Sequence, residues 1–515
     1  MRSRLAVCAA VAIIGASAAS AQVWRSDQGD GTYRNPPLNA DYPDPDIIRV
    51  GKEFYFVSTT FANAPGLTML HSRDLVNWDI VSHLVERLDG RPQYDLQQGG
   101  AYRRGIYAPS LRYRDGTFYV AVTPVGQKTR IYSAADPKGP WTYKELDREA
   151  FDPALFFDDD GQAYLASSIG SDGTVTLYTL DEGVGRIVGS RVIHYNKGAE
   201  GTKIVKRGGW YYLFNALPGK LALTVSRARA LTGPWEVRPQ IDDTTGGHQG
   251  AIVDLPNGDY YGFVMLDAGA IGRVTNISPI FWRDDWPVWG TPEAPGRVPD
   301  RAPIPVAGRG FVEPPASDEF GGAVLGRQWQ WNHNPMPELW SLTERPGWLR
   351  LRAAPGDQLW WARNTLVQKG QAPRARGEVE VDASAIRSGD VCGFGTFGKY
   401  SGQISVLGLP DGGRALTMRV TEAATDGPKV DVQVERQSVR ADRIWLRTDM
   451  DFPAKKAVLS YSEDGKRFVP LGAEVPLIYD WRTGTFQGVQ FAISCYRAQG
   501  KGGYLDINGF SLSRY

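Results

Sequence analysis

Short runs of alternating apolar and polar residues, each introduced by a turn that contains glycine, recur along the first 300 residues. Such alternation predicts half-buried β-strands, and Asp-Gly, Gly-Gly and Asn-Gly turns are typical of hairpins, because glycine accepts a positive φ. Five hairpins lead into an aromatic strand: "GKEFYFVS" at 51, "DGTFYVAV" at 115, "DGQAYLAS" at 160, "GGWYYLFN" at 208 and "NGDYYGFV" at 257.

The five hairpins share a tyrosine and form an internal repeat. The intervals are 64, 45, 48 and 49 residues between Tyr55, Tyr119, Tyr164, Tyr212 and Tyr261. A spacing near fifty residues, filled by short strands with almost no helical periodicity, is typical of one four-stranded blade per unit. We therefore expect residues 22–300 to form a five-bladed β-propeller. A β-sandwich with unrelated Gly-Tyr hairpins is the alternative, because strand spacing by itself does not establish closure.

The pattern changes between residues 283 and 320, where prolines are frequent and alternation is lost. Proline fixes φ and removes a backbone donor, so residues 301–315 are predicted to be a linker. Alternation then returns, for example in "WLRLRAA" at 348 and "KVDVQVER" at 429. These runs predict a β-sandwich over residues 316–515. The expected fold class is all-β, with a propeller followed by a sandwich.

The first 21 residues have the pattern of a signal peptide. Arg2 and Arg4 precede an apolar stretch from Leu5 to Gly15, and Ala19-Ser20-Ala21 forms a small-residue cleavage site. The apolar stretch is shorter than the ~20 residues that span a bilayer, and an uncleaved anchor is the alternative. We expect a secreted or periplasmic protein without a membrane partner.

Composition narrows the functional classes. The net charge is +1 with both signs interspersed, so no nucleic acid or anionic membrane is expected as a partner. The 16 Trp and 23 Tyr suit stacking on the C–H faces of sugars as well as core packing. Only Cys392 and Cys495 remain once residues 1–21 are removed, and they either form one disulfide or stay as separate buried thiols.

Three acids stand at corresponding places, each one strand ahead of a predicted hairpin. Asp44 lies between two prolines in "DYPDPD", Asp152 precedes a proline in "FDPALFF", and Glu200 lies in "KGAEGTK". Pro45 favours an extended backbone at Asp44. Each acid by itself could belong to an ordinary turn or surface loop. Their shared position ahead of the hairpins favours a catalytic role. Two opposed carboxylates can hydrolyse a glycosidic bond, and a third can adjust the pKa of the acid.

These stretches resemble glycoside hydrolase family 43. The resemblance covers about residues 34 to 290 and includes "NADYPDPDIIRV", "FDPALFFDDDGQAYL", "AEGTKIVKRGGWYYL" and "GGHQGAIVD". Beyond the linker, "SDEFGGAVLGRQWQW" and "ARNTLVQK" look like the concanavalin-A-type sandwich at the C-terminus of that family's β-xylosidases. The resemblance implies an inverting enzyme built on a five-bladed propeller.

The resemblance also implies roles for the three acids. Asp44 would be the general base, Glu200 the general acid, and Asp152 the residue that orients the acid and raises its pKa by its negative charge. Inversion needs the base and the acid roughly 6.5–9.5 Å apart, so that a water molecule fits between sugar and base.

Four further residues match the family's substrate pocket. Arg273, in "GRVT" where "GRET" is usual, would bind the sugar. Tyr107 stands where the family often has tryptophan, and Phe61 is either a sugar platform or blade core. His248 matches a histidine near the tunnel centre that in some members faces Ca²⁺ or its waters. No cofactor is required by this reading, and a Ca²⁺ ion near the propeller centre is the only metal it suggests.

The expected function is release of terminal β-D-xylose from xylo-oligosaccharides or xylan side chains, because the sandwich narrows the pocket mouth in this family. The nearest alternative is an α-L-arabinofuranosidase, or a bifunctional enzyme, acting on arabinoxylan or arabinan. A non-catalytic carbohydrate-binding propeller is the alternative of another class. The expected partner is plant cell-wall polysaccharide.

Overall fold

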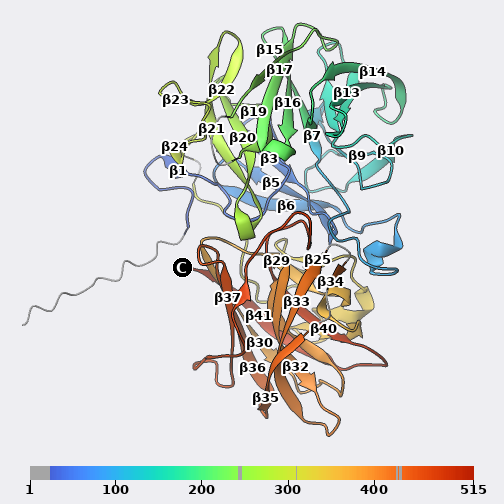
Figure 1. The fold of residues 1–515 in the computed structure, drawn as a ribbon, viewed down its shortest axis with the longest axis vertical. Coiled ribbons are helices and arrows are strands. Elements are labelled where there is room, and N and C mark those ends of the chain that lie inside the picture. The colour runs from blue at the N-terminus through green and yellow to red at the C-terminus, as the bar shows by residue number, and fades with distance from the viewer. Residues whose placement is uncertain (1–23, 242–245, 309, 425–426, 429–431) are drawn as a thin grey trace, which may run out of the picture.

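The structure, a computed structural model, describes residues 24–241, 246–308, 310–424, 427–428 and 432–515. The predicted signal peptide, residues 1–21, lies outside the described residues. Two β-domains lie one above the other, with the propeller at the top and the sandwich at the bottom of Figure 1.

Five sheets form the blades of the propeller. Blade 1 comprises β2 (Asp46–Val50), β3 (Glu53–Ser58), β5 (Gly66–Ser72) and β6 (Trp78–Val85). Blade 2 comprises β7 (Ser110–Arg114), β8 (Thr117–Val122), β9 (Arg130–Ala134) and β10 (Thr142–Glu145). Blade 3 comprises β11 (Ala154–Phe157), β12 (Ala163–Ser168), β13 (Thr174–Leu180) and β14 (Ile187–Tyr195). Blade 4 comprises β15 (Glu200–Arg207), β16 (Trp210–Leu217), β17 (Ala222–Ala228) and β18 (Glu236–Pro239). Blade 5 comprises β19 (His248–Asp254), β20 (Tyr260–Asp267), β21 (Arg273–Arg283), β22 (Trp286–Thr291) and β23 (Ala294–Pro295).

The first strand of every blade belongs to an inner ring. Along the ring β2, β7, β11, β15 and β19, each strand contacts the next, and β19 contacts β2. The ring is therefore closed, and the predicted five-bladed propeller is confirmed. The repeated tyrosine lies in the second strand of each blade, where it follows the hairpin turn.

The two ends of the propeller sequence pair with each other. β1 (Thr32–Arg34) is antiparallel to β24 (Arg301–Pro303). β24 lies inside the segment predicted as a linker, and Ala302 in it is buried in the propeller core. The first three residues of that segment therefore form part of the propeller, because a strand edge was available to pair with them.

The C-terminal domain has two sheets packed face to face. One sheet contains β25 (Gln330–Asn332), β28 (Ala354–Pro355), β29 (Leu366–Lys369), β31 (Val391–Phe397), β32 (Tyr400–Gly408), β33 (Arg414–Ala424), β34 (Gly427–Pro428), β35 (Val432–Val439) and β40 (Gln490–Arg497). The other contains β26 (Trp340–Ser341), β27 (Leu349–Arg352), β30 (Arg374–Asp382), β36 (Arg443–Asp451), β37 (Lys456–Ser462), β38 (Val469–Pro470), β39 (Val475–Pro476) and β41 (Tyr504–Arg514).

The sandwich core is apolar and closely packed. The rings of Phe394 and Phe491 from one sheet lie 5.9 Å and 5.7 Å from the ring of Phe510 in the other. Cys392 and Cys495 face each other on the adjacent strands β31 and β40, both are buried, and they form a disulfide. Of the two alternatives left by the sequence, the disulfide is the one that the structure contains.

Helical structure is confined to short turns. The described residues contain η1 (Pro92–Asp95), η2 (Pro218–Lys220), η3 (Gly269–Ile271), η4 (Pro337–Leu339) and η5 (Leu359–Trp361). Within the part of the chain that the structure describes, no helix has the length and apolar character needed to cross a bilayer.

The propeller and the sandwich share a sheet. β4 (Asn63–Ala64), from the loop between β3 and β5, pairs with β25 and so extends a sheet of the sandwich. The Gln330 amide donates to the Pro65 carbonyl at 2.7 Å, and the Ala101 N–H donates to Nε2 of His333 at 2.8 Å. Backbone pairing of this kind requires the two domains to dock in one register.

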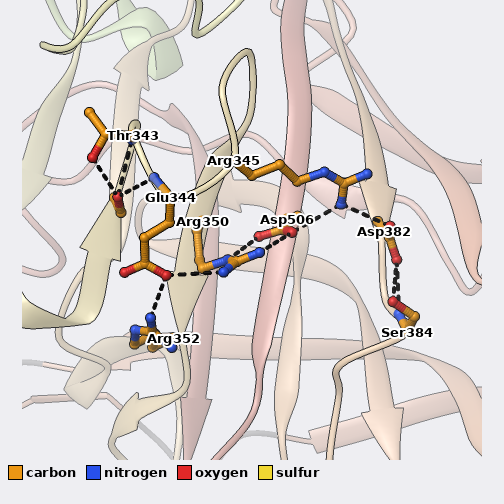
Figure 2. Close-up of polar contacts among 9 residues, drawn as sticks. Thr343, Glu344, Arg345, Arg350, Arg352, Asp382, Ser384 and Asp506 are labelled. Carbon is orange, nitrogen blue, oxygen red and sulfur yellow. Dashed lines mark hydrogen bonds and ion pairs between the residues drawn. The ribbon is translucent and has the colours of Figure 1, made fainter.

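A network of charged side chains joins three strands and a loop on one face of the sandwich (Figure 2). The Asp506 carboxylate, whose side chain is 3% exposed, accepts hydrogen bonds from Nε and Nη2 of Arg350 at 2.7 and 2.8 Å and from Arg345 at 3.0 Å. Arg345 also donates to Asp382 at 2.9 Å, and Glu344 accepts from Arg350 at 3.0 Å. The buried Asp506 thus holds β41 to β27 and to the loop that follows β26.

We expect Asp506→Ala to lower the free energy of unfolding by about 3 kcal/mol, because it removes the buried carboxylate that two partly buried guanidinium groups share. The matched control is Asp442→Ala, which removes the partner of Arg414 where the aspartate side chain is 63% exposed. That change should cost less than about 1 kcal/mol. Denaturant unfolding of both variants measures the difference, and equal losses would contradict a structural role for the network.

Candidate active site

Three carboxylates gather at one end of the propeller's inner ring. Asp44 and Asp152 precede the inner strands β2 and β11, and Glu200 is the first residue of β15. The negative charge of Asp44 raises the pKa of both other acids, and Glu200 raises the pKa of Asp152. The structure therefore brings the three acids close enough to interact electrostatically.

The backbone at Asp44 and Asp152 is left-handed, with φ of 53° and 44°. This region costs a residue other than glycine about 1–3 kcal/mol. The extended conformation predicted for Asp44 is therefore wrong. Tertiary hydrogen bonds override the local preference, because the Pro43 carbonyl accepts from Oγ of Ser58 at 2.8 Å and from the Thr59 N–H at 3.3 Å.

Arg273 supplies the positive charge beside these acids. It is the first residue of β21, is 5% exposed, and its Nη1 lies 3.1 Å from Oδ1 of Asp44. The Arg273 N–H donates to Oδ1 of Asp41 at 2.7 Å, which fixes the start of the strand. The sequence placed Arg273 in the substrate pocket, and the structure puts it in contact with Asp44.

Burial and charge give the acids different proton affinities. Burial raises the pKa of Asp44, while Arg273 lowers it. Burial, followed by the charge of Asp44, raises the pKa of Glu200 to about 7. Burial, followed by the charge of Glu200, raises the pKa of Asp152 well above its usual value. From the sequence, we expected the negative charge of Asp152 to raise the pKa of Glu200. In the structure, burial and the charge of Asp44 raise it.

A second buried cation, Lys203, was missed by the sequence reading. Its Nζ donates to the Pro109 carbonyl at 2.6 Å and lies 3.8 Å from Oδ2 of Asp46. Asp46 also accepts from Nη1 of Arg112 at 2.9 Å. Lys203 lowers the pKa of Asp44 and of Asp152. The only signal was a lysine inside a strand that is otherwise buried.

An aromatic wall borders the acids. The ring of Phe61, which is 1% exposed, lies 5.7 Å from the ring of Tyr107. The guanidinium of Arg273 lies 5.0 Å from the Phe61 ring centre. Tyr107 is partly exposed, and its hydroxyl donates to the Arg103 carbonyl at 2.8 Å. Both predicted aromatic residues thus lie in the same cluster as Arg273, although the Phe61 side chain is almost completely buried.

The sandwich contributes to the same wall through the loop between β39 and β40. Phe486 lies 4.8 Å from Phe61 between ring centres, and the Arg273 guanidinium lies 4.4 Å from the Phe486 ring centre. The Gln487 amide donates to the Thr60 carbonyl at 2.6 Å. The sequence reading named none of these loop residues, because contacts across more than 200 positions leave no local pattern.

His248, the first residue of β19, is buried beside this site. Its Nδ1 donates to the Gly246 carbonyl at 3.0 Å, and its Nε2 lies 3.9 Å from Oδ1 of Asp267. Burial lowers the pKa of His248, so the ring is neutral at pH 7.

The described residues include no cluster of three or more His, Cys, Asp or Glu side chains arranged to hold a metal ion. Ca²⁺ prefers six to eight oxygen ligands. A Ca²⁺ ion near the propeller centre, suggested by the sequence, therefore stays a prediction.

Two family descriptions match the chain. "Glycosyl hydrolases family 43" matches residues 33–287, and "Beta xylosidase C-terminal Concanavalin A-like domain" matches residues 317–513. The two matches correspond to the propeller and to the sandwich.

Individual relatives cover most of the chain. A protein of Xylanibacter ruminicola, provisionally named a beta-xylosidase, is 32% identical over 87% of this chain and 84% of its own. A non-reducing end alpha-L-arabinofuranosidase of Bacteroides ovatus is 33% identical over 62% of this chain and 65% of its own. The solved structure of a bifunctional GH43-CE protein of Bacteroides eggerthii superposes with a TM-score of 0.86 at 32% identity. It covers 94% of this chain, which spans 64% of that longer protein.

Glu200 gives a stability test of the acid cluster. Because its pKa is raised to about 7 in the folded protein, the unfolded chain loses this proton first, and folding stability falls as pH rises from about 4.5 to about 7. We expect Glu200→Gln to stabilise the protein by roughly 2 kcal/mol at pH 8 and to change little at pH 4.5.

Thermal unfolding at the two pH values measures this effect. Glu182→Gln, at an exposed position, is the control and should be neutral at both. A Glu200→Gln variant that is destabilised at pH 8 would contradict the raised pKa.

Proposed function

The chain belongs to glycosyl hydrolases family 43, and we propose that it is an inverting exo-glycosidase that releases terminal β-D-xylose from xylo-oligosaccharides or xylan side chains. The observation that carries this proposal is the cluster of Asp44, Asp152 and Glu200, in which burial and the charge of Asp44 raise the pKa of Glu200 to about 7. The match of the sandwich to a β-xylosidase domain supports xylose as the sugar.

The reaction would be a single displacement at the anomeric carbon. Asp44, whose ionised form is favoured by Arg273, takes a proton from water, and the water oxygen bonds to that carbon. Glu200 gives its proton to the leaving oxygen as the glycosidic C–O bond breaks. Water and leaving group lie on opposite faces of the sugar, so the configuration inverts.

Asp152 would orient Glu200. The backbone N–H of Gly201, next to the proposed acid, lowers the pKa of Asp152 against the larger effect of burial. Arg273 would bind the sugar, and the wall of Phe61, Tyr107 and Phe486 would border the same sugar ring. The sandwich loop that carries Phe486 packs against Phe61, which supports removal of single terminal residues rather than cleavage within a chain.

An α-L-arabinofuranosidase is the second candidate, supported by the similarity to the Bacteroides ovatus enzyme. The substrate would be a hemicellulose oligosaccharide in either case. A carbohydrate-binding protein without activity is opposed by the proton-retaining Glu200, which binding alone does not require. We further propose export from the cytoplasm, on the pattern of residues 1–21.

A substrate panel tests the sugar. We expect the purified chain to hydrolyse 4-nitrophenyl β-D-xyloside and xylobiose, and to act on 4-nitrophenyl α-L-arabinofuranoside at least ~10-fold more slowly in kcat/KM. Proton NMR of the first product should show α-xylose, the inverted anomer. Faster hydrolysis of the arabinofuranoside would favour the second candidate, and initial release of β-xylose would overturn inversion.

The proposed acid is tested by Glu200→Gln. We expect kcat on xylobiose to fall by ~10³-fold, within the usual contribution of general acid catalysis, while xylose binding is retained. The loss should be much smaller with 2,4-dinitrophenyl β-D-xyloside, whose leaving group needs no proton.

In the unaltered protein, kcat/KM on xylobiose should fall as pH rises above about 7, because Glu200 then loses its proton. An equal loss on both substrates would remove Glu200 from this role.

A further inference from the structure

Blade 5 repeats a backbone feature of the blades that carry the acids. At the starts of β2, β11 and β15, the residues Asp44, Asp152 and Gly201 have φ of 53°, 44° and 58°. In β19 the corresponding left-handed residue is Gln249, with φ of 49°. A residue other than glycine persists in this conformation only where the surrounding structure imposes it, and such residues cluster at functional sites.

Gln249 also lies in an irregularity of its strand. The pairing of β19 with β20 shifts register between His248 and Gly250, as the pairing of β15 with β16 shifts just after Glu200. A bulge leaves its extra residue out of the ladder and redirects that side chain, often beside an active site. The two strands thus use the same device, one for the proposed acid and one for Gln249.

The side chain of Gln249 lies against the residue that follows Glu200. A Cβ atom placed on Gly201 would stand 2.9 Å from Cδ and 3.0 Å from Oε1 of Gln249, so this carboxamide packs directly against Gly201. Gln249 is 4% exposed, and its Nε2 has no hydrogen-bond partner among the described residues.

An unpaired buried amide donor costs folding free energy, and most such groups in proteins have a partner. The backbone at Gln249 adds a further cost. At Gln249, no described residue accepts a hydrogen bond from Nε2 to offset these costs. The Gln249 carboxamide therefore carries a donor that no described residue uses, next to the residue that follows Glu200.

We propose that Gln249 is a substrate-binding residue whose Nε2 donates a hydrogen bond to a hydroxyl of the pentose held between Asp44 and Glu200. This inference rests on the proposed glycosidase function and adds a contact from blade 5 to it. Gln249 then has the same relation to its blade as Asp44 and Asp152 have to theirs.

The test compares Gln249→Leu with the unaltered protein on 4-nitrophenyl β-D-xyloside and on its 2-deoxy, 3-deoxy and 4-deoxy analogues. We expect kcat/KM on the xyloside to fall by ~10-fold, the value of one hydrogen bond to a neutral hydroxyl. On the analogue that lacks the contacted hydroxyl, the two proteins should differ by less than ~2-fold. The melting temperature without ligand should not fall, because Nε2 has no partner to lose.

The matched control is Gln403→Leu in the sandwich. Gln403 is equally buried, but its Nε2 donates to Oγ of Ser494 at 2.7 Å. This variant should melt at a lower temperature and keep its kcat/KM. Gln249→Gly, which relieves the left-handed backbone, should show the same kinetic loss as Gln249→Leu while folding at least as stably.

Two results would overturn the inference. One is unchanged kcat/KM in both Gln249 variants, and the other is the same loss on all four substrates together with a lowered melting temperature. If the unaltered protein hydrolyses no pentoside, it is the proposed glycosidase function that fails. If the unaltered protein is active but the Gln249 variants give either of these two results, it is the proposed Gln249 contact that fails.

Discussion

The buried ion pair between Asp44 and Arg273 controls the charge balance of the site. An ionised carboxylate taken out of water costs several kcal/mol unless a cation accompanies it. Arg273 accompanies Asp44, and the charge of Lys203 favours the ionised forms of Asp44 and Asp152 by lowering the pKa of each. The charges of Arg273 and Lys203 favour the ionised form of Asp44, while burial and the charge of Asp44 favour the protonated form of Glu200 by raising its pKa. A glycosidase needs such a proton for its leaving group.

The same arginine couples the two domains. Asp41 accepts a hydrogen bond from the Arg273 N–H through one carboxylate oxygen and from the Gly488 N–H through the other, at 2.7 and 3.1 Å. Gly488 belongs to the sandwich loop that carries Phe486. Gly272 and Gly488 approach so closely that a Cβ on either would meet the backbone of the other. The sandwich is thus a structural part of the site, and the shared pairing of β4 with β25 holds it in register.

The conformation of the backbone sets the direction in which the functional side chains point. Left-handed residues and register shifts occur at the starts of inner strands, where the chain enters the ring. Each has a free-energy cost that the blades around it must offset. The propeller supplies that support, because every inner strand is paired to its own blade and packed against the inner strands on both sides.

The sequence alone determined the blade count, the sandwich and the three acids. Hairpin turns and period-two alternation are local features of the chain, so Tyr55 and its four counterparts each predicted one blade. Asp44, Asp152 and Glu200 occupied the same position relative to the hairpins of three blades. Only the tertiary structure decided the φ of Asp44, the burial of Lys203, the disulfide and the contacts of Phe486 and Gln249. Those features depend on residues far apart in the chain, whose proximity arises from ring closure and domain docking rather than from any local pattern.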